Sequence, residues 1–192
     1  MRSRSSRRSP AAPEFVVPRP AKASSLPSHR GAGPAKLQEP VNLREPQIRR
    51  YARHILLPDV GGVGQARLLA AAARLTVGPE RPASAAALAY LAAAGVGTLV
   101  IAAGEQGPIT ELEVEGNIVL GVGDVGRDRF EALRERLAAL NPDVHTVGDP
   151  GARSDVYDVL IDAEPASGDV AAALVAGGTA AVRALVALTR ES

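Results

Sequence analysis

The sequence predicts an α/β protein with a doubly wound, mainly parallel β-sheet and flanking helices. Two apolar runs of strand length support this prediction, GTLVIAAG at residues 97–104 and YDVLIDA at residues 157–163. A helical pattern precedes each run, at about residues 83–95 and 125–144 respectively. Strands that alternate with helices are typical of parallel sheets, in which strands buried on both faces form continuous apolar runs.

The first half of the pattern begins with a helix in the later part of residues 43–57. PDVGG at 58–62 predicts a turn, GQARLLAAAARL a short helix, and ARLTVG at 73–78 the first strand. The strand, turn, alanine-rich helix and second strand that follow have the layout of a nucleotide-binding unit, and Gly95 ends the helix as a C-terminal glycine should. Four apolar residues of the first helix fall at helical spacing on one face, namely Ile48, Tyr51, Ile55 and Leu56.

The second half contains one clear helix and one ambiguous segment. Residues 105–124 are irregular and acidic, and we expect a short strand at 117–122. An amphipathic helix follows within residues 125–144, and its Asn-Pro pair ends it. Residues 168–190 allow either one helix broken at Gly177-Gly178 or a helix followed by a strand. The apolar stripe of the clear helix consists of Phe130, Leu133, Leu137 and Leu140.

Charge divides the chain into a basic head and a mildly acidic body. Of the 22 Lys and Arg and 21 Asp and Glu residues, eight basic and two acidic ones lie in residues 1–40, a net charge of +6. The remaining 14 basic and 19 acidic residues give the body a net charge of −5. The head is rich in Ser, Arg and Pro and has no sustained periodicity. We therefore expect residues 1–42 to be a disordered tail and residues 43–192 to form one domain.

Three interpretations of the head remain: a solvated tail, a tether for nucleic acid or an acidic partner, and an organelle transit peptide. Its first 13 residues resemble a transit peptide in composition, but the prolines at positions 10, 13, 18 and 20 would break an amphipathic helix. We favour the solvated tail and a cytoplasmic location, without nucleic acid as a partner. The absence of cysteine excludes disulfides, thiolate zinc sites and a cysteine nucleophile. No apolar run unbroken by charged or polar residues reaches the roughly 20 residues of a membrane span.

Four motifs of the body occur in an order and spacing that indicate one family. They read RRYARHILLPDVGGVGQARLL, YLAAAGVGTLVI, DVGRDRFEALRERLAALNPDV and YDVLIDA, and they cover about residues 44–166. Together they resemble the ThiF/MoeB/HesA group, bacterial relatives of the ubiquitin-activating enzymes, whose matching segments include RYSRQILLPEIGxxGQxKL and DVGRPKVEAAxxRLxxLNPxV. The resemblance implies a Rossmann-like fold of the ThiF-type NAD/FAD-binding class. It also implies an enzyme that uses ATP and Mg²⁺ to adenylate the C-terminal carboxylate of a ubiquitin-like sulfur carrier.

The phosphate loop implied by the resemblance is heavily changed. The group's glycine-rich GxGGxG corresponds to Pro79, Arg81, Pro82 and Ser84, or, with one inserted residue, to a loop that keeps Gly78 alone. Backbone N–H groups of such a loop bind phosphate at a helix N-terminus, but proline has no N–H to donate. We therefore expect that phosphate binding in the group's manner is lost and that Pro82 begins an ordinary helix.

Other ATP contacts implied by the resemblance are replaced as well. Ala103 occupies the position of the acid that would bind the ribose, and only the second acid of the group's DGD remains, as Glu105. The group's NLQRQ is replaced by ELEVE at 111–115, so that glutamates stand where an arginine would neutralise phosphate charge. The aspartate that would face Mg²⁺ aligns with Pro165.

The residues that remain define the candidate site. The resemblance implies that Arg53 reaches the ATP of a neighbouring subunit and that Arg129 stands in place of the group's lysine, so we take these two as candidate catalytic residues. Gly78, Glu105 and the strand-end Asp162 are the remnants of an ATP site. No metal site is predicted.

Two functional hypotheses follow from this pattern of loss. The first is a degenerate family member without adenylation activity or a cofactor, which serves as a binding or dimerisation partner. Its partner would be a second copy, a fuller ThiF-like paralogue or a ubiquitin-like carrier. The alternative is an active ATP-dependent and Mg²⁺-dependent adenylyltransferase that acts on such a carrier. Because the group continues into further strands, we expect a truncated domain that self-associates through the apolar C-terminal segment 170–188.

Overall fold

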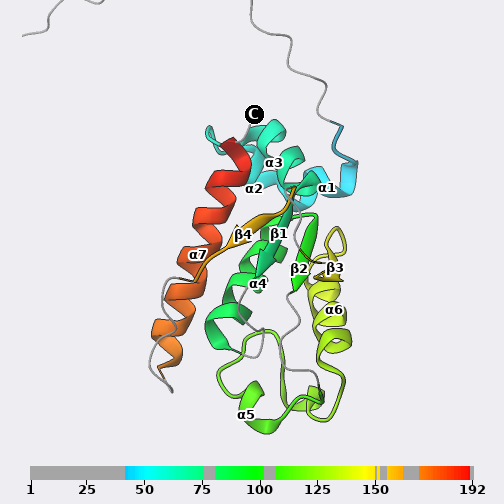
Figure 1. The fold of residues 1–192 in the computed structure, drawn as a ribbon. Coiled ribbons are helices and arrows are strands. Elements are labelled where there is room, and N and C mark those ends of the chain that lie inside the picture. The colour runs from blue at the N-terminus through cyan, green and yellow to red at the C-terminus, as the bar shows by residue number, and fades with distance from the viewer. Residues whose placement is uncertain are drawn as a thin grey trace, which may run out of the picture. The chain divides into compact units, whose positions relative to one another are not determined.

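The computed structural model describes residues 42–75, 81–101, 107–149, 151, 155–161 and 169–190. Almost all of the predicted tail lies outside these ranges. Figure 1 shows the arrangement of the helices and strands. In chain order they are α1 (Glu45–Arg50), α2 (Ala52–Ile55), α3 (Gly61–Ala70), β1 (Ala72–Leu75), α4 (Pro82–Ala94), β2 (Thr98–Ile101), α5 (Glu111–Val114), the 3₁₀ turn η1 (Val122–Asp124), α6 (Arg129–Leu140), β3 (His145–Gly148), β4 (Tyr157–Val159) and α7 (Val170–Arg190).

The four strands form one parallel sheet in the order β3-β2-β1-β4. The chain builds outward from β1 to β2 and β3, and then returns to place β4 on the other side of β1. This is the order of the Rossmann fold, so the predicted α/β class is confirmed. Leu75 pairs with both Ile101 and Val159, and Ile101 pairs with Gly148, so all four strands end at the same edge.

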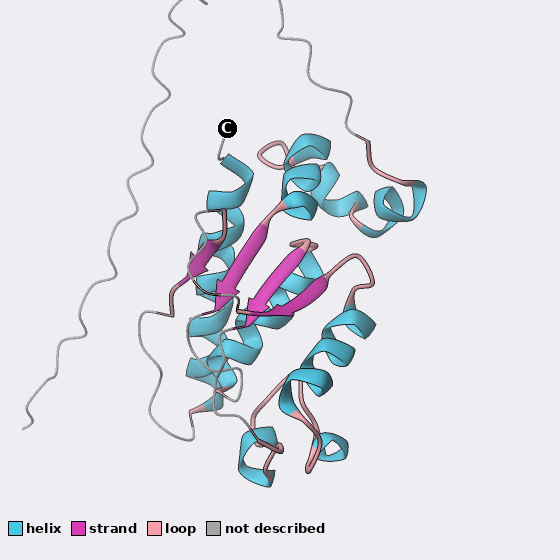
Figure 2. Ribbon diagram, turned by 45° about the vertical axis from the view of Figure 1, so that its right-hand side comes forward, coloured by secondary structure: helices cyan, strands magenta, loops and turns pink. Residues whose placement is uncertain are grey.

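Helices α4, α6 and α7 lie on one face of the sheet, with α4 in the middle (Figure 1 and Figure 2). Their inward residues join those of β1, β2 and β4 in one core cluster. The core consists mainly of Ala, Val and Leu, and nine of the 13 residues of α4 are buried. An alanine-rich helix suits this central place because small side chains let its neighbours approach from several sides.

The segment with two predicted alternatives is a single helix, α7, which continues through Gly177 and Gly178. The helix continues because the glycines serve tertiary packing. A Cβ atom on Gly177 would lie 2.0 Å from the carbonyl oxygen of Ala83, so only glycine allows α7 to lie this close to the first turn of α4.

Helix α7 is long and apolar enough to cross a membrane, with a mean hydropathy of 1.8 in its most apolar window, of which 28% is buried. The sequence analysis considered only runs unbroken by charged or polar residues, and Thr179 and Arg183 interrupt this helix. Six residues of α7 are buried, and four of them belong to the core cluster.

Two local predictions were wrong, and one strand was not predicted. Residues 117–122 do not form a strand, because the Asn117 side chain accepts hydrogen bonds from the N–H groups of Val119 and Leu120 and holds a turn. The strand β3 was missed, because this short edge strand is largely exposed and lacks an apolar run. Leu140 does not belong to the buried stripe of α6, since it lies in the last turn and is 52% exposed. Ala132, in the first turn of the helix, is buried instead.

The expected apolar face of the N-terminal helix is also wrong. The segment breaks at Tyr51, which separates α1 from α2. Tyr51 is buried, whereas Ile48 and Leu56 are 43% and 81% exposed. Buried Asn141 holds the Tyr51 side chain in place, because its Nδ2 donates hydrogen bonds to the Tyr51 hydroxyl at 2.9 Å and to the Ala92 carbonyl at 2.7 Å. The break directs one aromatic side chain inward and leaves the flanking aliphatic residues at the surface.

The sheet face opposite α4 carries a charged residue on its central strand. Arg74 alternates with the inward-facing Ala73 and Leu75, so its side chain lies on the other face. Its Nη2 donates to the Gly151 carbonyl at 2.8 Å, and it forms ion pairs with Asp149 and Asp158. Arg74 therefore ties the connection between β3 and β4 to the middle of the sheet.

Candidate functional site

The sheet order predicts where a ligand would bind. In open α/β sheets, ligands bind beyond the carboxyl ends of the strands, at the point where the strand order reverses. Here that point lies beyond β1 and β4, at the end of the sheet where Figure 1 shows α5. Gly78, Glu105 and Asp162 follow β1, β2 and β4 in the sequence, but all three lie outside the described residues, as do Pro79, Ala103 and Pro165.

The described part of the predicted phosphate loop is the start of α4. Arg81 is its N-cap residue without a side-chain cap, and Pro82 occupies its first turn, so the prediction that Pro82 begins the helix is confirmed. Ala83 and Ser84 are fully buried, and the Ser84 hydroxyl has no hydrogen-bond partner. Because the backbone of α7 at Gly177 lies against Ala83, one side of this first turn is covered by protein rather than open to a ligand.

Arg129 is the first residue of α6, a helix of 12 residues, and it is 8% exposed. Its Nη2 forms an ion pair with Oε1 of Glu113 in α5, which is one of the glutamates that replace the group's NLQRQ. The Arg129 Nε and Nη1 atoms are buried and have no hydrogen-bond partner among the described residues. The cation that the sequence identified is therefore present at this end of the sheet, but it is engaged by a carboxylate of its own chain.

The Glu113 carboxylate is held from two sides. Its Oε2 accepts hydrogen bonds from the Thr110 N–H at 2.6 Å and from the Thr110 hydroxyl at 2.8 Å, and its Oε1 faces Arg129. Burial alone would raise the pKa of Glu113, but the hydrogen bonds from Thr110 and Arg129 outweigh burial and lower this pKa. Glu113 is thus charged at neutral pH.

Asp124 organises the loop that carries α5 and leads to α6, and the sequence analysis did not single it out. It is fully buried, accepts from the Gly121 N–H at 3.0 Å, and binds Arg127 at 2.8 Å and Arg136 at 3.1 Å. Burial raises its pKa, but the hydrogen bonds from Gly121, Arg136 and Arg127 together lower it. The available signal was the aspartate of DVGR, placed directly before an arginine-rich amphipathic helix.

Arg53 lies at the other end of the molecule. It is an exposed residue of α2, near the amino ends of the strands, whereas Arg129 begins α6 near the carboxyl ends (Figure 1). The structure therefore does not bring the two predicted catalytic residues together within one chain. His54, next to Arg53, is held by a contact of 2.9 Å between its Nδ1 and Oε1 of the buried Gln65.

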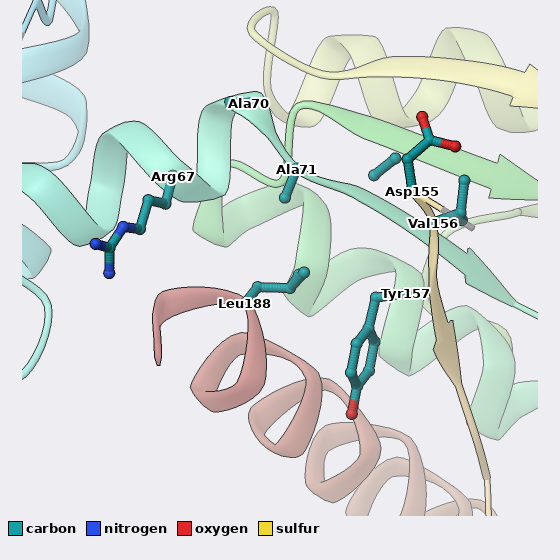
Figure 3. Close-up of a pocket in the computed structure, with 8 residues that line it drawn as sticks. Arg67, Ala70, Ala71, Asp155, Val156, Tyr157 and Leu188 are labelled. Atoms are coloured by element: carbon teal, nitrogen blue, oxygen red, sulfur yellow. The ribbon is translucent and has the colours of Figure 1, made fainter. Parts of the chain in front are cut away.

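A cavity of about 340 Å³ lies at the amino ends of β1 and β4, close to the C-terminal ends of α3 and α7. Figure 3 shows Arg67, Asp155, Tyr157 and Leu188 around it. Arg67 is engaged, since its Nη1 donates to the Thr189 carbonyl at 2.9 Å. None of the residues predicted for the ATP site lines this cavity, which lies at the opposite end of the sheet from the switch point.

ATP and Mg²⁺ do not fit the described part of the site in the manner that the resemblance implies. Arg129 is paired internally, Pro82 removes an N–H from the first turn of α4, and α7 covers part of that turn. Within the described ranges, no group of three or more His, Asp or Glu side chains could hold a metal ion.

The fold and this site define a Rossmann-like α/β protein with a buried, internally paired arginine at the start of α6. No family model matches the chain. It is 38% identical over 107 residues to the probable adenylyltransferase/sulfurtransferase MoeZ of Mycobacterium tuberculosis, covering 55% of this chain and 26% of that protein. It is 32% identical over 153 residues to the sulfur carrier protein ThiS adenylyltransferase of Escherichia coli, covering 74% of this chain and 59% of that protein.

A crystal structure of PaaA shows the same fold, with a TM-score of 0.51 and 22% sequence identity over 64% of this chain and 39% of that one. The chain belongs to the ThiF/MoeB/HesA family. It spans about a quarter of the length of MoeZ and three fifths of the ThiS adenylyltransferase.

Proposed function

We propose that this chain is a member of the family that does not adenylate and that serves as a binding partner, for a second copy or for a fuller ThiF-like protein. The ion pair between Glu113 and Arg129 carries the proposal. Adenylyl transfer depends on cations and backbone donors that are free to stabilise charge on the phosphates. Here the arginine at the position of the family's lysine is already neutralised by an internal carboxylate.

The start of α4 supports the same conclusion. A phosphate at a helix N-terminus needs open N–H groups. Pro82 has no N–H, and Ala83 and Ser84 are fully buried in contact with the rest of the domain. The proposed function therefore requires neither ATP nor a metal ion.

The proposed partner surface is the outward face of α7. Val175, Val182 and Val186 are 69%, 58% and 40% exposed and recur at spacings of seven and four residues. They lie on the side of the helix opposite its buried residues, so they form an apolar stripe that the described part of the domain leaves uncovered. A second α7, or an apolar helix of a fuller homologue, would match it.

Nucleotide chemistry provides the direct test of the proposed function. Calorimetry of the full chain with ATP and Mg²⁺ should give no sub-millimolar binding, and ATP–pyrophosphate exchange should be absent with a ubiquitin-like sulfur carrier present. Exchange above the level of a blank without the chain would refute the proposal.

Association is tested separately by sedimentation velocity of the full chain. Val182→Asp should shift the chain toward monomer because it places a charge in the stripe. Val122→Asp is the matched control, since Val122 is 83% exposed and lies in η1, away from α7. Equal effects of the two substitutions, or a wild-type monomer at high micromolar concentration, would exclude this surface as a self-association site.

The second candidate function is an ATP-dependent adenylyltransferase that acts on a ubiquitin-like sulfur carrier. The position of Arg53 favours it, because an exposed arginine far from its own switch point is placed to reach the site of another subunit. The names of MoeZ and the ThiS adenylyltransferase point to the same chemistry. If exchange is detected, Arg53→Ala should abolish it, and undiminished exchange in this variant would remove the role of Arg53.

A further inference from the structure

The Glu113 carboxylate occupies the position that an anion would take beside Arg129. One of its oxygens faces the Arg129 guanidinium, and the other accepts both the N–H and the hydroxyl of Thr110. The side chains of Arg129 and Glu113 are only 10% and 14% exposed. A carboxylate held by an arginine and by a backbone N–H has the surroundings of a bound oxyanion.

Arg129 has more donors than Glu113 can use. The guanidinium of arginine presents five N–H donors in a planar fork. The Glu113 contact engages Nη2, whereas Nε and Nη1 are buried without an acceptor in the part of the chain that the structure describes. Buried and unused donors of a charged group are costly, so they favour an anion that offers more acceptor oxygens than one carboxylate edge.

The start of α6 already holds an anion of its own, because the Asp128 carboxylate caps the helix and accepts from the Glu131 N–H at 2.9 Å. The preference for an oxyanion therefore rests on the open donors of Arg129 and not on this helix end.

We propose that Glu113 is a built-in occupant of an oxyanion site at Arg129, and that its negative charge keeps phosphate-class anions out. This inference rests on the proposed function, because it explains how the site is closed. Removal of the carboxylate charge should open the site to pyrophosphate. The capping box at the start of α5 does not need the charge, since a glutamine at this position can still bond back to Thr110.

The test compares pyrophosphate binding by variants of the full chain, measured by calorimetry at low ionic strength, where charge interactions are least screened. Glu113→Gln should bind pyrophosphate roughly tenfold or more tightly than the wild type, because it frees a buried charged donor. Glu111→Gln is the matched control, since it removes the same charge from an exposed position of the same short helix. The double variant E113Q/R129Q should lose the gained binding.

Each outcome decides the inference. Tightening in Glu113→Gln alone, reversed in the double variant, supports it. Equal affinities of the wild type and Glu113→Gln, or equal effects of Glu113→Gln and Glu111→Gln, overturn it. If circular dichroism shows that Glu113→Gln does not fold, Glu113→Ala is judged by the same criteria. ATP–pyrophosphate exchange by the wild type would refute the proposed function, whereas a lack of tightening in an exchange-inactive chain refutes only this inference.

Discussion

Substitution of the two neighbouring glycines of α7 by alanine should have opposite effects on stability. At Gly177 a Cβ atom would lie 2.0 Å from the Ala83 carbonyl oxygen and 2.8 Å from the Ala86 Cβ. At Gly178 the nearest atom is a ring carbon of Tyr90 at 3.3 Å, and this tyrosine is 54% exposed and free to move. The two positions share one helix, so they differ only in what the added methyl group meets.

The expected magnitudes follow from these contacts. Alanine is favoured over glycine within a helix by about 1 kcal/mol at both positions. In Gly178→Ala this gain persists almost in full, so the free energy of unfolding should rise by about 0.5–1 kcal/mol. In Gly177→Ala the obstacle is a backbone carbonyl inside α4, so the helices must separate at a cost of about 1–3 kcal/mol or more. After the propensity gain is included, the net result is a loss of up to about 2 kcal/mol or more.

Urea unfolding of the full-length variants, followed by circular dichroism at 222 nm, measures both changes. The difference between the variants, about 2 kcal/mol, should also separate their melting temperatures by roughly 4–8 °C for a domain of this size. If Gly177→Ala is as stable as Gly178→Ala, α7 does not pack against the first turn of α4 in this register. The covered helix start that supports the proposed function would then be lost as an argument.

Two further predictions concern buried polar groups. Burial raises the pKa of Tyr51, although its hydrogen bond with Asn141 opposes the shift, so the folded state keeps the proton longer than the unfolded state. The free energy of unfolding should therefore fall as the pH rises above 10.0, the pKa of the unfolded state. Tyr51→Phe should cost about 1 kcal/mol at neutral pH, and in melts at several pH values it should weaken this alkaline loss of stability. The lowered pKa of Asp124 has the opposite sign, because its stabilisation is present above the unfolded value of 3.8 and disappears as the pH falls. Asp124→Asn should cost about 1–3 kcal/mol at neutral pH, a cost that is limited because Arg127 and Arg136 are partly solvated. The stability of this variant should vary less with pH in the acid range than that of the wild type, and an unchanged acid profile would contradict the role of Asp124.

Much of the fold could be predicted because it depends on strong local patterns. The apolar runs of β2 and β4 and the amphipathic pattern of α6 identified these elements, and the end of α4 at Gly95 is confirmed by its left-handed conformation, with φ of 85°. The missed features depend on tertiary contacts. An exposed edge strand such as β3 has no apolar signature, and two adjacent glycines predict a break unless the partner helix that requires them is known.

The candidate site was predictable in part. Sequence motifs identified Arg129 and showed that acids replace the family's polar residues at 111–115. They could not show that Glu113 meets Arg129, because the two residues are 16 positions apart and the loop between them is shaped by buried Asp124. Gly78, Glu105 and Asp162 stay predictions, since they lie outside the described residues.

Packing and ligand chemistry use different residues of the same elements, and this separation explains how the family's fold persists beside an altered site. In α6, Leu133 and Leu137 fill the core, while Arg129 at the first position of the helix pairs with Glu113 of α5. Exchange of polar residues in α5 changes the electrostatics of that region without removing a core side chain, because none of the residues of α5 is buried. The buried pair of Arg129 and Glu113 forms a contact between α5 and α6. A domain altered in this way can keep its fold and its surfaces for partners, and the proposed function attributes a loss of phosphate binding to the exchange of a few charged and glycine residues.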